Sequence, residues 1–431
     1  MSVTLYPLAI LALTFIIGIP VSFSMIISCI PYFFLDPNAA ATTVIQKLVT
    51  GCENASLMAI PFFIIAGSIM NYSGITERLF GLADAFVGHL TGGLGHVNIL
   101  LSTMMGGISG SGAADAASDC KLIVPEMVRH GYDLSYAGAV TAASAVITPI
   151  IPPGVGLIVY ACIMEVSVGR LLCAGYVPGI MMCVGMMIAN HIISKKRGYK
   201  ANRDKMLPLR QILRLALDAL WALFLPFGLI LGLRIGMCTP TEGGALMAVY
   251  ALLVGKFVYK ELELKKLPEI MLDGALNTAA IMLIMAAANL LSFYMSWERI
   301  PYYMTNAIIS IAPNKFVFLL LSMILLLILG MFMDGMAAMI VIAPLLGPVA
   351  ETFGINMVHF GLIMCLNSAI GAISPPFGNY LFLVAGTLKV STAKVVKQIL
   401  PFLLVCIIVL FLCTYIPDLV LVIPDLIYGV G

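Results

Sequence analysis

The chain has 431 residues and a net charge of +2, with 61% hydrophobic residues and only 10% charged ones. A soluble domain carries about a quarter charged residues, so this chain has too few charges to cover a surface exposed to water. Lipid must be the solvent for much of it, and the near-neutral charge gives no reason to expect a nucleic-acid partner. The long apolar runs do not alternate in polarity as barrel strands do, so we predict an all-α polytopic membrane protein.

The predicted elements begin with Tyr6–Phe34, which Pro20 interrupts and which we expect to cross the membrane twice in short pieces. Met1–Phe23 lacks a basic start and a small-residue cleavage signal, so we interpret it as a retained span and not as a signal peptide. A span at Leu57–Met70 and a less apolar arm helix at Ile75–Leu90 follow. At roughly 20 apolar residues per span, the whole chain has room for about ten.

Next in the chain comes a predicted re-entrant hairpin at about 97–130, whose tip contains the glycine-rich segment Gly106–Gly112. Glycine permits a tight reversal; the alternative is close helix packing by small residues. A span at 134–164 is interrupted at Thr148–Gly156, because proline lacks an N–H and blocks an upstream carbonyl. The alternative there is a simple kink. A last span, Leu172–Ile193, closes a first unit at 1–200.

After a basic linker at 201–214, a second unit at 215–431 repeats this order. It has early spans broken at Pro240, a span at Ala275–Met295, an arm at Arg299–Ile311, a hairpin at about 315–354 broken at Gly330–Gly335, a span at 358–388 broken at Asn367–Gly378, and a last span at Ile399–Ile416.

The two units match at a constant spacing. Placing Ser111 over Asp334 gives an offset of 223 residues (334 − 111), which falls to 220 near the N-terminus (240 − 20). Gly and Pro determine backbone geometry, so a run of such matches at one offset predicts a structural repeat. The matched residues are Pro125 with Pro348, Gly131 with Gly354, Gly138 with Gly361, Pro152-Pro153 with Pro375-Pro376, and Pro178 with Pro401.

Basic loops predict the orientation of these units. The longest, Lys195–Arg214, is cytoplasmic by the positive-inside rule, and Lys256–Lys266 and Lys389–Lys397 come out on the same side. Five crossings before the central loop make the second unit inverted and place both termini in the periplasm. A single crossing at Tyr6–Phe34 would break this parity.

Paired breaks in inverted repeats are typical of transporters, in which half-helix N-termini face anions and unwound carbonyl groups face cations. Uncharged oxygen ligands suit a hard cation, so we predict two Na⁺ sites and no organic cofactor. The predicted Na⁺ ligands are Ser109, Gly110, Ala145 and Thr148 at the first site, and Gly330, Gly335, Ser368, Gly371 and Ser374 at the second.

The predicted substrate site lies between the hairpin tips. A carboxylate inside the membrane is functional by default because its burial is costly, although Asp115 and Asp334 could instead only cap hairpin arms. Asp334 would repel an acid, so its alternative role is to hold hydroxyl groups or a cation. Asp119 is expected to be interfacial or salt-bridged. The predicted substrate-binding residues are Ser111, Gly112, Asp115, Asp334, Asn367, Pro153 and Pro376.

Five segments together resemble the large membrane subunit of tripartite ATP-independent periplasmic (TRAP) transporters. They are Ala59–Phe63, Ser109–Asp115, Pro149–Pro153, Thr239–Glu242 and Ser374–Gly378. The resemblance implies an elevator-type, sodium-driven transporter in the bacterial inner membrane, with a small membrane subunit and a periplasmic substrate-binding protein as partners. It also implies organic acids as substrates, among them C4-dicarboxylates, sialic acid and other sugar acids.

Two other function classes compete with this interpretation. One is a membrane-embedded enzyme that uses Asp115 and Asp334 as a paired acid and base. The other is a passive channel, which would not need paired hairpins. The sequence contains no GxxxxGK[ST], HExxH or GxSxG motif, so it carries no recognisable ATPase or hydrolase site, and we expect a transporter and not an enzyme.

Overall fold

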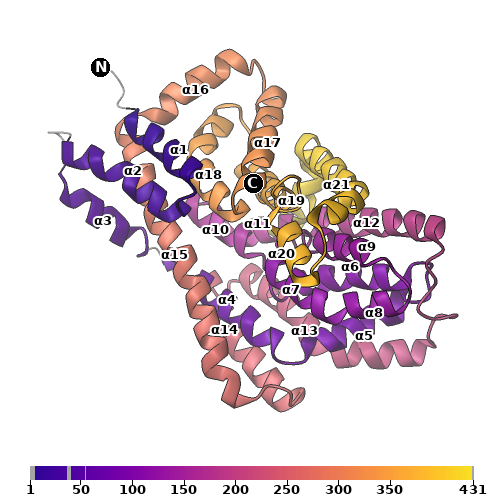
Figure 1. The fold of residues 1–431 in the computed structure, drawn as a ribbon. Coiled ribbons are helices and arrows are strands. Elements are labelled where there is room, and N and C mark those ends of the chain that lie inside the picture. Colours follow the sequence, from indigo (N-terminus) through magenta and orange to yellow (C-terminus); the bar gives the residue numbers. More distant parts are fainter. Residues whose placement is uncertain (1–4, 36–39, 54, 430–431) are drawn as a thin grey trace.

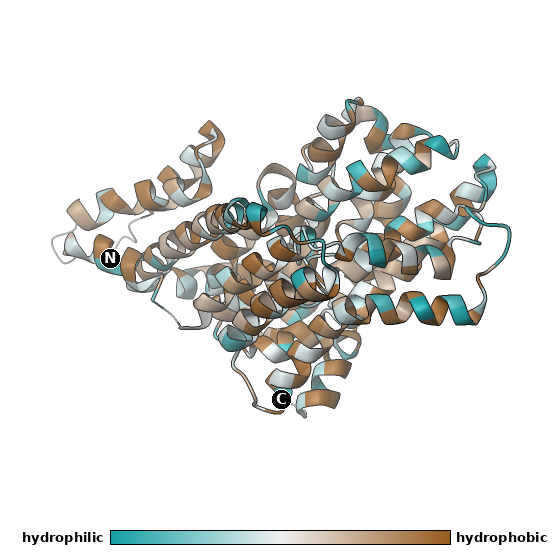
Figure 2. Cartoon of the chain, turned by 90° about the horizontal axis from the view of Figure 1, so that it is seen from below, coloured by the Kyte–Doolittle hydropathy of each residue, from teal (hydrophilic) through white to brown (hydrophobic). Residues whose placement is uncertain are grey.

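The computed structural model describes residues 5–35, 40–53 and 55–429, and this part of the chain is helical, with no strand (Figure 1). Seven of its helices are long and apolar enough to cross a membrane, or up to eight if the bent pair α4 (Ala59–Asn71) and α5 (Ile75–Val87) is one span. Hydrophobic residues predominate along most helices in Figure 2. The predicted all-α polytopic membrane fold is therefore confirmed.

The segment predicted to cross in two short pieces forms two helices, α1 (Tyr6–Ile17) and α2 (Val21–Leu35), which pack against each other. Gly18 ends α1 in the left-handed conformation with φ +86°, and Pro20 immediately precedes α2. Helices of 12 and 15 residues extend roughly 18 and 22 Å, less than the roughly 30 Å of a bilayer core.

The rest of the first half contains the first hairpin, α6 to α8, and the first broken span, α9 with α10. Its elements are α3 (Thr42–Thr50), η1 (Ala55–Met58), α4, α5, α6 (Gly93–Gly106), α7 (Gly112–Leu122), α8 (Val124–Arg129), α9 (Leu134–Ser144), α10 (Val155–Ile163), α11 (Val168–Ala174) and α12 (Tyr176–Arg197).

The second half also contains a hairpin, α17 and α18, and a broken span, α19 with α20. Its elements are α13 (Leu209–Arg234), α14 (Pro240–Leu253), η2 (Val254–Val258), η3 (Leu264–Lys266), α15 (Leu267–Trp297), α16 (Ile300–Ile311), α17 (Lys315–Phe332), α18 (Gly335–Thr352), α19 (Met357–Gly371), α20 (Asn379–Leu388), α21 (Thr392–Tyr415) and α22 (Pro417–Tyr428).

The hairpins and broken spans of the two halves interlock. Helix α20 packs against α7 and α9, and α10 packs against α18 and α19, so each broken span reaches the hairpin of the other half. We call these elements, α6 to α10 and α17 to α20, the hairpin block. The opposite orientation of the halves in the membrane stays a prediction.

A second group of helices lies beside the hairpin block. The long helix α15 packs along α2, α3 and α4, while α14 packs closely on α4, as Figure 1 shows for the diagonal α15 and its neighbours. Helix α13 packs against α5 and α14. We call α4, α5, α13, α14 and α15 the frame. The cavity described below lies where the frame meets the hairpin block.

Candidate functional site

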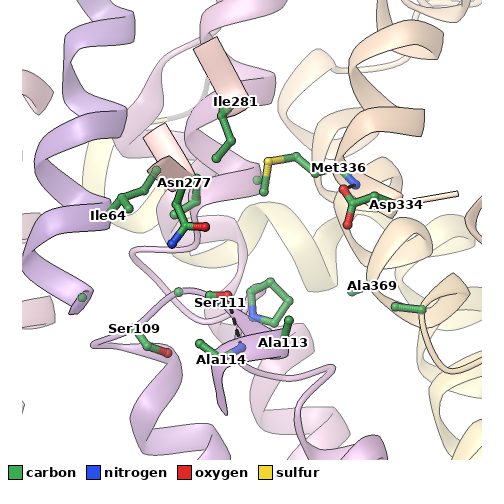
Figure 3. Close-up of a pocket in the computed structure, with 18 of the residues that line it drawn as sticks. Ile64, Ser109, Ser111, Ala113, Ala114, Asn277, Ile281, Asp334, Met336 and Ala369 are labelled. Atoms are coloured by element: carbon green, nitrogen blue, oxygen red, sulfur yellow. Dashed lines mark hydrogen bonds between the residues drawn. The ribbon is translucent and has the colours of Figure 1, made fainter. Parts of the chain in front are cut away.

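A cavity of about 520 Å³ opens between the two hairpin tips (Figure 3). This volume lies within the range of roughly 300–1,000 Å³ that is usual for small-molecule sites. Both tips, the start of α10 and the start of α20 line it from the hairpin block, and α4 and α15 line it from the frame. The cavity therefore lies where the sequence predicts substrate binding.

The tip of the first hairpin is an open turn. Helix α6 ends at Gly106, the turn passes through Gly110 with φ +59°, and α7 begins at Gly112 with Ser111 as its N-cap. The Ser111 hydroxyl oxygen accepts a long hydrogen bond of 3.5 Å from the Ala114 N–H. Four predicted residues of this tip line the cavity, namely Ser109, Gly110, Ser111 and Gly112.

The tip of the second hairpin carries a carboxylate at the matching position. Asp334 is the N-cap of α18, and its Oδ1 accepts hydrogen bonds from the N–H groups of Met336 at 3.0 Å and Ala337 at 3.2 Å. The side chain is also exposed to the cavity, which Gly335 lines as well. Figure 3 shows Ser111 and Asp334 entering the cavity from the two different tips. Asp334 is thus a cap and a cavity residue at once.

Asp115 does not line the cavity. It lies one turn into α7, 2% exposed, and its Oδ2 accepts a hydrogen bond of 2.8 Å from the Thr148 hydroxyl group. The salt bridge expected for Asp119 was wrong: this residue is buried on the same face of α7, and the described residues supply no ion pair to it. Its interfacial depth in the membrane stays a prediction. Residues i and i+4 share a helix face, so the spacing could have shown the pair. Oδ1 of each carboxylate has no partner in the described part of the chain.

The first break contacts the first tip directly. A Cβ added to Gly112 would lie 2.4 Å from the Ala145 carbonyl oxygen and 2.5 Å from the Tyr380 hydroxyl oxygen. A Cβ on Gly110 would lie 2.8 Å from the Pro153 carbonyl oxygen. The Ala145 carbonyl oxygen, a predicted Na⁺ ligand, therefore lies against the first tip, and Tyr380 brings in a hydroxyl group from the second half of the chain.

The second break contacts the second tip in the same way. A Cβ on Gly335 would lie 2.5 Å from the Ser368 carbonyl oxygen, and one on Gly330 would lie 3.1 Å from the Gly371 Cα. The buried Ser368 hydroxyl group has no partner within the described ranges, and it belongs to a cavity-lining residue. Ser374 is satisfied locally, because its hydroxyl group donates to the Ile370 carbonyl oxygen at 2.9 Å.

Besides Asp115, three predicted substrate residues lie away from the cavity surface. Asn367 is fully buried in α19; its side-chain N–H donates to the Met323 carbonyl oxygen at 3.2 Å and its Oδ1 is unpartnered among the described residues. Pro153 is buried and Pro376 is exposed, and neither lines the cavity. Both belong to cis Pro-Pro bonds, Pro152-Pro153 and Pro375-Pro376.

Sequence reasoning missed the polar residues that the frame contributes. Asn71 on α4 and the pair Asp273 and Asn277 on α15 line the cavity, as does Tyr380 on α20 (Figure 3 labels Asn277). Asp273 and Asn277 are four residues apart inside a long apolar helix, so they share one face. An Asp and an Asn at this spacing in a long apolar helix were the available signal.

The sequence matches one family of transport proteins over almost its whole length. Residues 8–419 match the family described as the DctM component of tripartite ATP-independent periplasmic transporters. The sialic acid TRAP transporter large permease protein SiaM of Vibrio cholerae is 36% identical, with 96% of each chain covered. The C4-dicarboxylate TRAP transporter large permease protein DctM of Rhodobacter capsulatus is 33% identical, covering 95% of this chain and 96% of its own length.

A solved structure shares the fold. The YdaH transporter of Alcanivorax borkumensis superimposes with a TM-score of 0.64 at 13% identity, covering 95% of this chain and 98% of that one. The matching family consists of transporter permeases and not of enzymes. The resemblance in the sequence is thus confirmed, and the chain belongs to the DctM-component family of tripartite ATP-independent periplasmic transporters.

Proposed function

We propose that this chain takes up an organic acid across the bacterial inner membrane and that a sodium gradient drives the uptake. A periplasmic substrate-binding protein delivers the acid, and a small membrane subunit completes the transporter. The names of the relatives, which include sialic acid and C4-dicarboxylate permeases, support a carboxylate as substrate. The observation that carries the proposal is the cavity between the two hairpin tips, each of which contacts a broken span.

In this mechanism each Na⁺ binds where a hairpin tip contacts the break in the broken span of the same half. The first site uses oxygens of Ser109, Gly110, Ala145 and Thr148, and the second uses oxygens of Gly330, Gly335, Ser368, Gly371 and Ser374. The Ala145 and Ser368 carbonyl oxygens lie against Gly112 and Gly335, so an ion there would hold each tip to its break. Uncharged oxygens fit Na⁺ as a transported ion that must also leave. Ordering both tips prepares the cavity for the substrate.

Transport then moves the hairpin block along the frame and exposes the cavity alternately to each side. The cavity lies at the boundary between the two groups of helices, which supports this elevator movement. The frame would stay in place with the small membrane subunit.

Reconstitution tests the proposal. The chain is placed in liposomes with its small membrane subunit, the binding protein is added outside, and uptake of radiolabelled sialic acid and succinate is measured with an inward Na⁺ gradient or with K⁺ in its place. Uptake of at least one acid should require both the gradient and the binding protein. Equal uptake without the gradient would indicate a passive channel, and chemical conversion of the acid would indicate an enzyme.

A further inference from the structure

The charges around the cavity define the kind of acid that it fits. Among the described residues that line it, two are carboxylic acids, Asp273 and Asp334, and none is Lys, Arg or His. Carboxylate groups are usually bound by basic side chains or by N–H groups at helix N-termini. A substrate carboxylate in this cavity must therefore use helix N-termini or a bound cation, and its position is restricted to places without an aspartate.

Helix N-termini without an acidic cap provide such a place at α7, α10 and α20, and the Tyr380 hydroxyl group of α20 lies against Gly112 of the first tip. Helix α7 is capped by the neutral Ser111, and the Asp115 of its first turn is buried outside the cavity lining and accepts a hydrogen bond from Thr148. Helix α10 begins after Gly154 with no side-chain cap, while Val155 and Gly156 line the cavity. At the start of α18 the N–H groups of Met336 and Ala337 already donate to Asp334, so a substrate carboxylate would meet this acid instead. The cavity thus has an anion-binding end at α7 and α10 and a hydrogen-bond-accepting end at Asp334.

The accepting end favours hydrogen-bond donors. Asp334 Oδ1 is used by the helix cap, and the exposed carboxylate still presents acceptor capacity to the cavity. Asp273 and Asn277 add acceptors from α15. Hydroxyl groups that donate to a carboxylate make stronger hydrogen bonds than neutral pairs do, whereas a second substrate carboxylate would be repelled by the two aspartates, Asp273 and Asp334, that line this end.

We propose that the substrate is a hydroxylated monocarboxylate, a sugar acid in type, and that unsubstituted dicarboxylates are disfavoured by the cavity itself. This inference rests on the proposed function, because it assigns a substrate class to the same cavity. The carboxylate lies against the starts of α7 and α10, and the hydroxyl groups face Asp334 and α15. The difference between Ser111 and Asp334 at matched repeat positions is what gives the cavity two unlike ends.

Direct binding to the purified permease tests this without the selectivity of the binding protein. The full chain, purified with its small membrane subunit, is titrated in Na⁺ and in K⁺ with three acids of equal chain length. They are D-gluconate, which has one carboxylate and many hydroxyl groups, adipate, which has two carboxylates, and hexanoate, which has one carboxylate alone. We expect gluconate to bind in Na⁺ at least tenfold more tightly than adipate or hexanoate.

The variant Asp334→Asn tests whether the Asp334 carboxylate causes the preference for gluconate. Asparagine is as good an N-cap as aspartate, so α18 keeps its cap and loses only the charge. The variant should bind gluconate about tenfold more weakly, and its preference for gluconate over adipate should narrow. Asp133→Asn is the matched control, since Asp133 caps α9 through Tyr136 N–H at 3.0 Å outside the cavity lining. The control should bind all three acids as the parent does.

Adipate binding equal to or tighter than gluconate binding would overturn the inference, as would failure of gluconate to bind in Na⁺. An unchanged preference for gluconate over adipate in Asp334→Asn would show that Asp334 does not select the substrate, and it would overturn the inference as well. In each case Na⁺-driven uptake of succinate or sialic acid in liposomes would leave the proposed function standing. Loss of gradient-driven uptake for every acid would refute the proposed function instead.

Discussion

Ser111 and Asp334 occupy equivalent places in the two hairpins, yet one is neutral and the other is charged. The substitution Ser111→Asp would place an aspartate, the residue of the second hairpin tip, at the matching position of the first tip. Aspartate caps a helix as well as serine does, so α7 should persist. The new carboxylate would face the substrate carboxylate, and like charges at about 4 Å cost up to about 4 kcal/mol near a protein surface. We expect uptake to fall by at least tenfold, measured as initial rate in liposomes.

Ser167→Asp is the control for that substitution. Ser167 caps α11 through the Arg170 N–H at 3.4 Å, nearly the geometry of Ser111, but it does not line the cavity. Its variant should transport at the parental rate. If both variants lost activity equally, the effect would come from charge at any N-cap and not from the substrate site.

Gly335 tests the second Na⁺ site. A methyl group there would meet the Ser368 carbonyl oxygen at 2.5 Å, so the tip and the break must separate. Overpacking of this kind costs about 1–3 kcal/mol, which corresponds to roughly 5- to 150-fold in an equilibrium constant. Gly335→Ala should therefore raise the Na⁺ concentration for half-maximal uptake by about tenfold. Gly386→Ala on α20, where no heavy atom lies within 4 Å, should leave the Na⁺ dependence unchanged.

Among elements, the hairpins and the broken spans could be predicted from sequence because Gly and Pro act locally on the backbone. Tyr380 could not, since its hydroxyl group reaches Gly112 from an element that is 268 residues away in the chain (380 − 112). The frame residues Asp273 and Asn277 were missed for a similar reason: α15 reads as an apolar span, and only the packing of α15 beside the tips places its polar face at the cavity.

The hairpin block and the frame touch at Gly107 and Pro226 on α13. A Cβ on Gly107 would lie 3.3 Å from the Pro226 Cβ, close to the 3.5–4.5 Å that is typical of a disulfide. The double variant Gly107→Cys with Pro226→Cys should cross-link under oxidation. If the block moves along the frame, oxidation should reduce uptake to background, and dithiothreitol should restore it.

The two single variants, oxidised and reduced in parallel, control for the substitutions themselves. Mobility of the protein on a non-reducing gel after proteolysis between the two positions reports whether the bond has formed. Full uptake with the bond formed would mean that the first tip and α13 move together, which contradicts the elevator movement proposed above.

At the scale of the whole molecule, each half contains a hairpin and a broken span, but the two hairpins differ in chemistry. Asp115 and Asp119 are buried in the first hairpin, and the equivalent positions of the second, Ala338 and Ile342, are apolar. The basic linker and the loop before α21 are the features that predict orientation, because positive charge is retained on the cytoplasmic side. Opposite orientation of the halves requires that α1 and α2 together return the chain to its starting side.

Labelling of single cysteines tests this orientation. Cys52 is exposed and Cys238 is half-exposed, so both are first replaced by Ser, while the other eight cysteines are buried. New cysteines are then placed at Lys205 in the linker, at Ser391 before α21, and at Asp418 beyond it. A membrane-impermeant maleimide should label the Asp418 position in intact spheroplasts, and the Lys205 and Ser391 positions only in inverted vesicles. Helix α21 lies between Ser391 and Asp418, so labelling of both from one side would mean that it does not cross the membrane. The reverse labelling pattern at all three positions would mean that the molecule has the opposite orientation in the membrane. The proposed sodium gradient would then act on the cavity from the opposite side.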